Sequence, residues 1–391
     1  MSSTRRTPSR SSSGGPTGSS SSTSSTKRRS RSADVLSRLV VAGAGMAGLV
    51  AAARARELGA AAVVHEKGDR AGGSMLLSSG VVWRHRSLAE FRAECPGGDA
   101  ALQGRIIDEL DDALNWLESL GAPVTAPETG NERAIGRRFD PQGLTDALVS
   151  AAGDVRLQEP FAAADVLATG GFGARLARER GLLLRAAPWS EGDGLAYALE
   201  RGAALSPGQE EFYGRALPGG VEEGEFVGAA QLYARHALVL DDAGNDLGEP
   251  AWHESDIVQR FPDGRAWYLV DARALREHIR ERTVGELVEA ARGAGGDVRP
   301  AEELPFAVPA SPKLQEPPFL AIRVHAGVTH TIGGLRIDER ARVLGEDGSP
   351  ISGLHAAGAD AGGIFTGGYG SGLAAALVFG RIAAESALAG A

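Results

Sequence analysis

The chain has 391 residues, of which 43% are hydrophobic, enough to bury a large core in two or three structural units. Its single cysteine, Cys95, excludes an intramolecular disulfide framework, a cysteine-based zinc site and a CxxC redox pair. Residues 1–33 hold seven basic residues and no acidic one, so the rest of the chain carries 34 basic against 50 acidic residues. That balance of −16 disfavours nucleic acid as a partner. We find no run of about 18 apolar residues and expect no membrane span or membrane partner, and a cytoplasmic protein.

Residues 1–36 are predicted to form a disordered tail. Fourteen of the first 33 residues are serine, and the segment has no hydrophobic periodicity from which a core could be built. Its Arg/Ser-rich start is similar to a transit peptide, and Arg5-Arg6 is similar to a twin-arginine signal. No amphipathic helix or apolar stretch accompanies either feature, and we therefore favour a solvated tail.

The strongest local pattern follows this tail. Leu39–Val41 is typical of a short buried strand, and it leads into a complete G-x-G-x-x-G motif at Gly43–Gly48. Helix-forming residues continue from Met46 to about Leu58, and a second strand is predicted at Ala61–His65. The order of strand, motif, helix and strand within about 30 residues predicts a dinucleotide-binding βαβ unit.

Each residue of the motif has a physical reason. Gly43 allows the tight turn, Gly45 lets backbone amides approach a pyrophosphate, and Gly48 lets the helix pack closely on the strand. The diphosphate would then sit on the helix N-terminus. Glu66 lies 18 residues after Gly48, where a carboxylate hydrogen-bonds ribose hydroxyls and disfavours a 2′-phosphate.

Three further segments favour FAD over NAD. A glycine-rich loop, Lys67–Ser74, follows the ribose acid directly. A strand at Asp165–Gly171 ends in small residues, and another at Gly353–Asp360 ends in an acid. A helix is then predicted from about Ser371 to Leu388, and its N-terminus carries about half a positive charge, which would stabilise an anionic reduced flavin.

With these motifs the chain resembles the flavoprotein-subunit family of fumarate reductase and succinate dehydrogenase, in the soluble branch that includes ketosteroid and tricarballylate-type dehydrogenases. The resemblance covers residues 38–391 and rests on GAGMAG, EKGDRAGGS, VLATGGFG, GDG, THTIGG, GLHAAGAD and GSGLAAALVFGRIAA. It implies an α/β fold, a Rossmann-like FAD-binding domain with a glutathione-reductase-like parallel sheet and an inserted α+β cap domain. We expect the FAD-binding domain at residues 37–212 and 325–391, and the cap at residues 213–324.

The resemblance also implies which residues contact FAD. Ser74 stands where membrane-bound relatives attach FAD through a histidine, so we expect non-covalent FAD. Asp360 stands where the family usually has a glutamate that bonds the ribityl chain. No metal ligands are expected. The implied FAD-binding residues are Gly43, Gly45, Met46, Ala47, Gly48, Glu66, Lys67, Ser74, Met75, Ser79, Gly80, Ala168, Thr169, Gly170, Asp193, His330, Asp360, Gly372 and Leu373.

In this family the substrate binds between cap and flavin, and a hydride moves between the flavin and a carbon beside a carbonyl. Fumarate-type members grip two carboxylates with histidines and arginines. Here the gripping histidine falls on Thr329 and one arginine position falls on Gly367, while His253 is nearest to the catalytic arginine. Because charge-assisted contacts are lost, we expect a small-molecule carbonyl substrate that is not a small dicarboxylate.

Aromatic residues stand in place of that grip, namely Phe212, Tyr213, Trp252 and Tyr369. Among them and their neighbours, Tyr369, Tyr213 and His253 are the candidate proton carriers. The predicted activity is an FAD-dependent dehydrogenase or reductase acting on CH–CH or C=C bonds.

Two other functions remain open, a flavin monooxygenase and a non-catalytic flavin-binding protein. Without a second dinucleotide motif or ligands for haem or iron–sulfur clusters, an oxidoreductase of this kind needs an external electron carrier. A quinone, an electron-transfer flavoprotein and oxygen are all compatible with the sequence.

Overall fold

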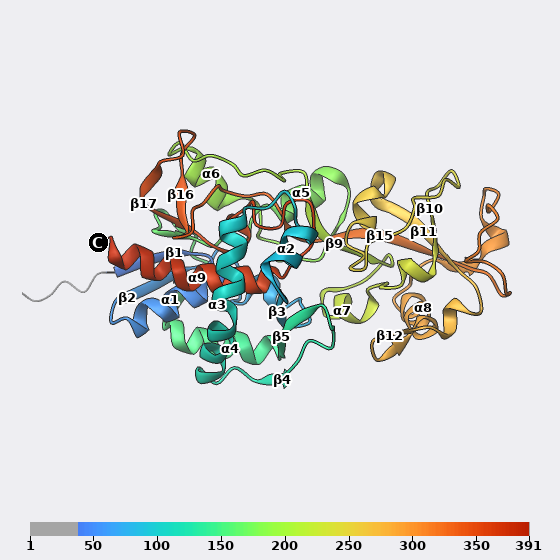
Figure 1. Cartoon of the computed structure of the whole chain (residues 1–391), viewed down its shortest axis with the longest axis horizontal. Helices are drawn as coiled ribbons and strands as arrows, with labels where there is room; N and C mark the ends of the chain where they lie inside the picture. Colours follow the sequence, from blue (N-terminus) through green and yellow to red (C-terminus); the bar gives the residue numbers. More distant parts are fainter. Residues whose placement is uncertain (1–37, 391) are drawn as a thin grey trace, which may run out of the picture. The chain divides into compact units, whose positions relative to one another are not determined.

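A six-stranded sheet joins segments from both ends of the chain (Figure 1). The computed structural model describes residues 38–390, so the predicted tail lies outside the described residues. Five strands run parallel, and the edge strand β16 pairs antiparallel with β17. In spatial order the strands are β16 (Arg342–Leu344), β17 (Pro350–Ala356), β7 (Val166–Leu167), β1 (Arg38–Ala42), β2 (Ala61–His65) and β6 (Asp154–Arg156).

The central strands are apolar because helices and loops cover a parallel sheet on its faces. Val41 and Val64 are fully buried and lie opposite each other in the β1–β2 ladder. The predicted strand at Ala61–His65 and the predicted helix after the glycine motif are confirmed as β2 and α1 (Met46–Glu57). The parallel sheet confirms the predicted α/β class.

Three helices pack on this sheet and on one another, namely α1, α4 (Pro141–Ala152) and α9 (Gly372–Ala389). Helix α1 is buried on almost every side, as its run of alanines and other apolar residues requires. Gly380 of α9 faces α1 so closely that a Cβ there would lie 2.7 Å from the carbonyl oxygen of Ala47. The two helices therefore depend on small residues where they meet.

Helix α9 is long and apolar enough to cross a membrane, by length and composition alone. The expectation of no membrane span stays a prediction. More than half of the helix is buried inside the protein, and that burial accounts for its apolar composition.

The remaining elements of the FAD-binding part surround the sheet. Its other helices are α2 (Leu88–Glu94), α3 (Ala100–Ser119), α5 (Gly173–Arg180) and α6 (Asp193–Leu199). A separate antiparallel sheet has the order β3 (Val81–His85), β5 (Ala134–Phe139) and β4 (Val124–Ala126).

The cap is built on a second, antiparallel sheet. Its strands, in order, are β10 (Leu238–Leu240), β11 (Arg265–Val270), β15 (Leu320–Thr331) and β14 (Val298–Pro300). Two further strands, β8 (Leu183–Leu184) and β9 (Phe212–Leu217), also pair with β15. The other cap elements are α7 (Phe226–Ala229), α8 (Val284–Gly293) and a hairpin of β12 (His278–Ile279) and β13 (Arg282–Thr283).

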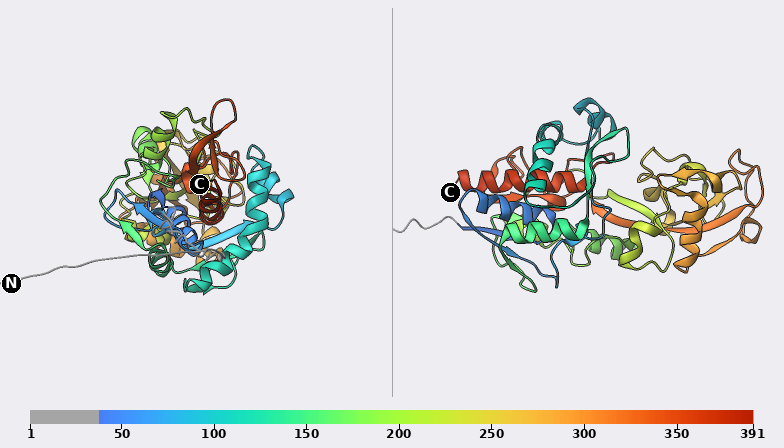
Figure 2. Two further views of the ribbon diagram at one scale, coloured as in Figure 1. Left: turned by 90° about the vertical axis from the view of Figure 1, so that its left-hand side faces the viewer. Right: turned by 90° about the horizontal axis from the view of Figure 1, so that it is seen from below.

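Strand β15 connects the cap with the FAD-binding part (Figure 2). Its first half pairs with β11 and β14, and its second half pairs with β9 and β8. The expected boundaries at residues 212/213 and 324/325 fall at the start of β9 and inside β15, and the described residues all belong to one compact unit. Those boundaries stay predictions, and "cap" is used below for residues 213–324.

Replacing Gly48 tests the packing of α1. A Cβ at this position would lie 1.9 Å from the carbonyl oxygen of Gly43, so Gly48→Ala forces helix and turn apart. We expect a loss of about 1–3 kcal/mol in the free energy of unfolding, measured by urea denaturation of the FAD-free protein. The control is Gly104→Ala in α3, where a Cβ meets nothing within 4 Å and alanine favours the helix. Equal stability of the two variants would contradict the packing argument.

Candidate FAD and substrate site

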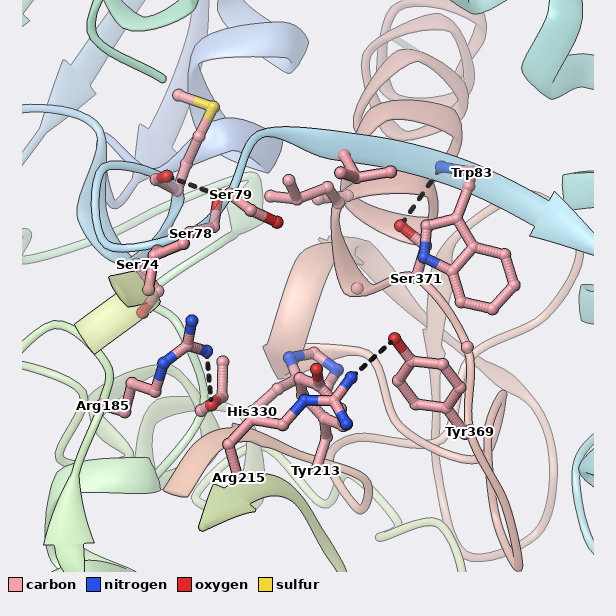
Figure 3. A pocket seen from close by; sticks show the side chains of 18 of the residues that line it. Ser74, Ser78, Ser79, Trp83, Arg185, Tyr213, Arg215, His330, Tyr369 and Ser371 are labelled. Atoms are coloured by element: carbon pink, nitrogen blue, oxygen red, sulfur yellow. Dashed lines mark hydrogen bonds between the residues drawn. The ribbon is translucent and has the colours of Figure 1, made fainter. Parts of the chain in front are cut away.

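A cavity of about 740 Å³ lies where the first turns of α1 and α9 meet strands β9 and β15 and the cap (Figure 3). Its volume is within the range of small-molecule and cofactor sites. Cap residues from 252 to 254 and from 278 to 280 also line it. The cavity is thus shared by both parts of the fold.

The N-terminus of α1 forms one end of this cavity. Gly45, Met46 and Ala47 line it, and no side chain caps the free amides of the first turn. Gly43 and Gly48 do not line the cavity. Gly43 has φ +98° and lies against Ala168, where a Cβ would be 2.2 Å from the carbonyl oxygen. The outer glycines of the motif therefore shape the turn, and Gly45 leaves room for a diphosphate.

The predicted ribose acid also faces the cavity. Glu66 accepts hydrogen bonds from the backbone amides of Ala44 (2.8 Å) and Gly68 (2.7 Å). A carboxylate has about four acceptor positions, so two remain for a ribose diol. Lys67 and Asp193 lie outside the lining residues and form an ion pair with each other.

The turn after β7 supplies a further wall through Ala168, Thr169 and Gly170. Asp360, expected on the ribityl chain, instead holds this turn from behind. Its buried carboxylate accepts hydrogen bonds from the amides of Thr169 (2.5 Å) and Gly171 (2.9 Å). Burial raises the pKa of this carboxyl group. Asp360 is absent from the cavity lining and shapes this wall, and its direct contact with the ribityl chain stays a prediction.

A serine-rich segment lines another wall, through Ser74, Met75, Ser78 and Ser79. The hydroxyl of Ser74 accepts a hydrogen bond from the amide of Ala187 (2.9 Å). Gly80 does not line the cavity, because its Cβ position lies against the carbonyl oxygen of Phe139, 2.0 Å away.

The N-terminus of α9 faces the cavity opposite the cap. Ser371 caps the helix by accepting from the amide of Ala374 (3.3 Å), and Gly372 and Leu373 line the cavity. The half-buried ring of His330 packs beside this turn, and desolvation lowers its pKa to about 4. The imidazole is therefore neutral near pH 7, and the positive end of the helix dipole is the charge offered here.

Strand register brings the substrate-side residues together. Tyr213 of β9 pairs with His330 of β15, while Gly214 pairs with Val328, so Thr329 is an extra, bulged residue. A bulge re-aims side chains beside it. Arg185 follows β8, and its amide donates to the carbonyl oxygen of Val328 (2.7 Å).

Two arginines in this wall, Arg185 and Arg215, were missed in the sequence analysis. Successive side chains of a strand point to opposite faces, so Arg215 shares the cavity face of β9 with Tyr213. Phe212 points the other way and is buried in the core, and its expected role in the aromatic wall was wrong. Side chains two positions apart share a face of a strand, and this alternation, counted from Tyr213, could have identified Arg215 from the sequence.

Tyr369 lies at the centre of an aromatic cluster in the cavity. The ring centres of Trp83, Tyr213, Trp252 and His253 are 4.9 to 5.7 Å from its own. Its hydroxyl accepts a hydrogen bond from Arg215 Nη2 at 3.3 Å (Figure 3). The three proposed proton carriers, Tyr369, Tyr213 and His253, therefore occupy one site.

The two phenols of this cluster differ in acidity. Burial opposes ionisation of Tyr213, but the positive charges of Arg215 and Arg185 outweigh it and lower its pKa below 10. Burial raises the pKa of Tyr369 well above its usual value. Burial also lowers the pKa of His253 to about 4, so this ring is neutral near pH 7. Tyr213 is thus the phenol that ionises first.

Within residues 38–390 no three His, Cys, Asp or Glu side chains gather as a metal site. The lone thiol, Cys95, is buried, and burial raises its pKa to about 12. Two helix N-termini, arginines and phenols are among the groups that line the cavity.

The chain matches the FAD binding domain family over residues 38–146 and 139–372, and it belongs to that family. The Gly45 turn, Glu66 and the two helix N-termini in one cavity fit such a cofactor. FAD is therefore the cofactor of this protein, which is an FAD-dependent oxidoreductase.

Similar proteins cover most of the chain. A probable fumarate reductase, Ifc3, from Shewanella frigidimarina is 26% identical over 90% of this chain and 74% of its own length. The open conformation of a flavocytochrome c3 fumarate reductase has a TM-score of 0.67 at 21% identity, covering 90% of this chain and 78% of that one. A 3-ketosteroid-Δ4-(5α)-dehydrogenase from Rhodococcus jostii RHA1 has a TM-score of 0.64 at 19% identity, covering 90% and 97%. These likenesses show the fold.

Replacing Gly45 separates cofactor binding from folding. Gly45 has φ −76°, and a Cβ there meets no protein atom within 4 Å. We expect Gly45→Ala to leave the unfolding free energy of the FAD-free protein within about 0.5 kcal/mol. FAD affinity, measured by titration of the apoprotein, should fall at least tenfold because the methyl group enters the diphosphate space. Unchanged FAD affinity would place the diphosphate elsewhere.

The absence of a histidine at Ser74 predicts that FAD dissociates from unfolded protein. Acid precipitation should leave all flavin absorbance in the supernatant. In a second sample, Ser74→His tests whether the position lies near enough to the ring for covalent attachment. Flavin that stays with the precipitated native-sequence protein would contradict non-covalent binding.

Proposed function

We propose that the protein exchanges a hydride between FAD and a carbon beside a carbonyl group, making or breaking a carbon–carbon double bond. The observation that carries this proposal is the pair of phenols, Tyr213 and Tyr369, beside Arg215 in the cavity that the α9 N-terminus also lines. The likeness to a fumarate reductase and a ketosteroid dehydrogenase supports the same reaction type. We include in the proposal a substrate other than a small dicarboxylate.

FAD, when bound, supplies the hydride acceptor or donor. The protein must then move one proton on or off the neighbouring carbon. Tyr213 is the group we assign to that step, because Arg215 and Arg185 stabilise its anionic form. In dehydrogenation its phenolate takes the proton, and in reduction its phenol returns it.

Tyr369 keeps its proton over a wider pH range, so its hydroxyl is suited to donate a hydrogen bond to the substrate carbonyl or to Tyr213. His253 is assigned a positioning role. Its backbone carbonyl accepts a hydrogen bond from Arg215, and its ring stacks on Tyr369 at 4.9 Å. Its Nδ1 lies 2.7 Å from the hydroxyl of Ser255, which fixes the ring.

The electrons leave or enter through an external carrier in this proposal. A quinone, an electron-transfer flavoprotein and oxygen remain the candidate classes. Stopped-flow oxidation of the reduced holoenzyme by oxygen would separate the proposal from a monooxygenase, which accumulates a flavin hydroperoxide. Reduced holoenzyme that passes electrons to no enone, quinone or dye would favour a non-catalytic flavoprotein.

Removing one phenol at a time tests the proton step. We expect Tyr213→Phe to slow anaerobic flavin bleaching by cyclic ketones at least a hundredfold, because general acid–base groups contribute about 10²–10⁴. Tyr369→Phe should slow it less and raise KM.

The pH profile of the native sequence gives a second readout. Dehydrogenation needs the Tyr213 phenolate, so the rate should rise with pH through an apparent pKa below 10 and level off above it. That step should vanish in Tyr213→Phe and persist in Tyr369→Phe. Full activity in Tyr213→Phe would remove this residue from the mechanism.

A further inference from the structure

Two guanidinium groups are buried in the substrate wall without an acidic partner. Arg185 is 7% exposed and Arg215 is 9% exposed. Among the described residues, no carboxylate oxygen lies within 4.0 Å of either side chain. A buried ion without a counter-charge costs several kcal/mol, so each arginine needs an anion or a strong set of acceptors.

The two arginines meet this need differently. Arg215 donates to the carbonyl oxygen of His253 and to the hydroxyl of Tyr369, and it lies over the ring of Tyr213. Although burial opposes its charge, the phenols and Glu254 raise its pKa. The surroundings of Arg215 thus favour the charged form.

Arg185 has no comparable set of partners. Its Nη1 donates to the hydroxyl of Thr329 at 3.2 Å, while its buried Nε has no hydrogen-bond partner. Burial lowers its pKa. A buried donor without an acceptor is costly to leave unsatisfied. Because Arg185 lines the cavity, an anion bound there can supply the counter-charge that the described residues do not.

The charged parts of FAD have donors elsewhere. The first turn of α1 is suited to the diphosphate, and the first turn of α9 is suited to the flavin ring. Arg185 belongs to neither turn and lies on the wall built by β8 and the β15 bulge. Its guanidinium group is therefore available to the second ligand of the cavity.

We propose that Arg185, held by Thr329, binds a carboxylate group of the substrate and sets specificity for it. This inference rests on the proposed function and names its substrate class, a carbonyl compound with a carboxylate and an apolar body of ring size. A planar guanidinium matches a planar carboxylate and forms two parallel hydrogen bonds with it. The aromatic cluster around Tyr369 holds the apolar body.

The charges around the cavity agree with this assignment. Six arginines line it against three acids, Glu66, Glu132 and Glu254, although the chain beyond residue 33 carries more acidic than basic residues. A cleft lined by one sign of charge concentrates ligands of the opposite sign. The lining arginines are Arg70, Arg133, Arg185, Arg215, Arg235 and Arg280.

Benzoate and benzamide test the assignment in the FAD-loaded protein, because they match in size and differ in charge. Binding is followed by the change in flavin absorbance and by calorimetry, and neither readout needs turnover. We expect benzoate to bind the native sequence at least tenfold more tightly than benzamide, a difference of about 1.4 kcal/mol. Arg185→Gln should abolish this preference. Arg276→Gln, an exposed change of the same net charge outside the cavity, should keep it.

Two further variants keep the test decisive if Arg185→Gln misfolds. Arg185→Lys keeps the charge but loses the planar pair of donors, so it should retain only part of the preference. Thr329→Val removes the hydroxyl that holds Nη1 and should weaken benzoate binding without changing the affinity for FAD. If Arg185→Gln does not retain FAD, these two variants decide the result.

Three outcomes would overturn the inference. The first is equal affinity of the native sequence for the two probes, and the second is a preference for benzoate that survives every variant. The third is a change of FAD affinity or flavin potential in Arg185→Gln while benzoate binding stays unchanged. The last outcome would assign Arg185 to the flavin. Inactivity toward cyclic ketones with the benzoate preference intact would instead count against the proposed reaction alone.

Discussion

The site depends on how closely helices α1 and α9 approach each other. Gly380 lies against the carbonyl oxygen of Ala47 at a distance that leaves no space for a side chain. Because both helices begin at the cavity, this contact fixes two positive dipole ends in one site. One end is suited to the diphosphate and the other to the flavin ring. Residues more than 300 positions apart in the chain therefore become one cofactor site through the packing of small residues.

The substrate side is positioned by strand pairing. Strands β8 and β9 pair with the same half of β15, and the bulge at Thr329 breaks the register there. The bulge places a hydroxyl beside Arg185. The two strands β9 and β15 also carry the chain between the cap and the FAD-binding part, so any movement of the cap would act on the residues that face the substrate.

Sequence patterns predicted what depends on neighbours along the chain. The glycine motif, both flanking strands and α1 lie within about 30 residues, and each has its own periodicity or turn residues. The roles of Asp360 and Arg185 could not be read in that way. Asp360 stands in a motif typical of cofactor contact, but whether it meets ligand or backbone depends on the turn at Thr169, almost 200 residues away. Arg185 lies in an apolar stretch with no motif, and only its burial without a counter-charge marks it.

The positive charges of the substrate wall link ligand binding to proton transfer. Arg185 and Arg215 both favour the phenolate of Tyr213, which makes that phenolate easier to form but weaker as a base. A carboxylate bound at Arg185 would cancel one of these charges, so the pKa of Tyr213 would rise toward that of a carbon-bound proton beside a carbonyl. A neutral ligand of the same shape would leave both charges in place. Under this arrangement the anionic group contributes to affinity and also strengthens the base that must act on the neighbouring carbon.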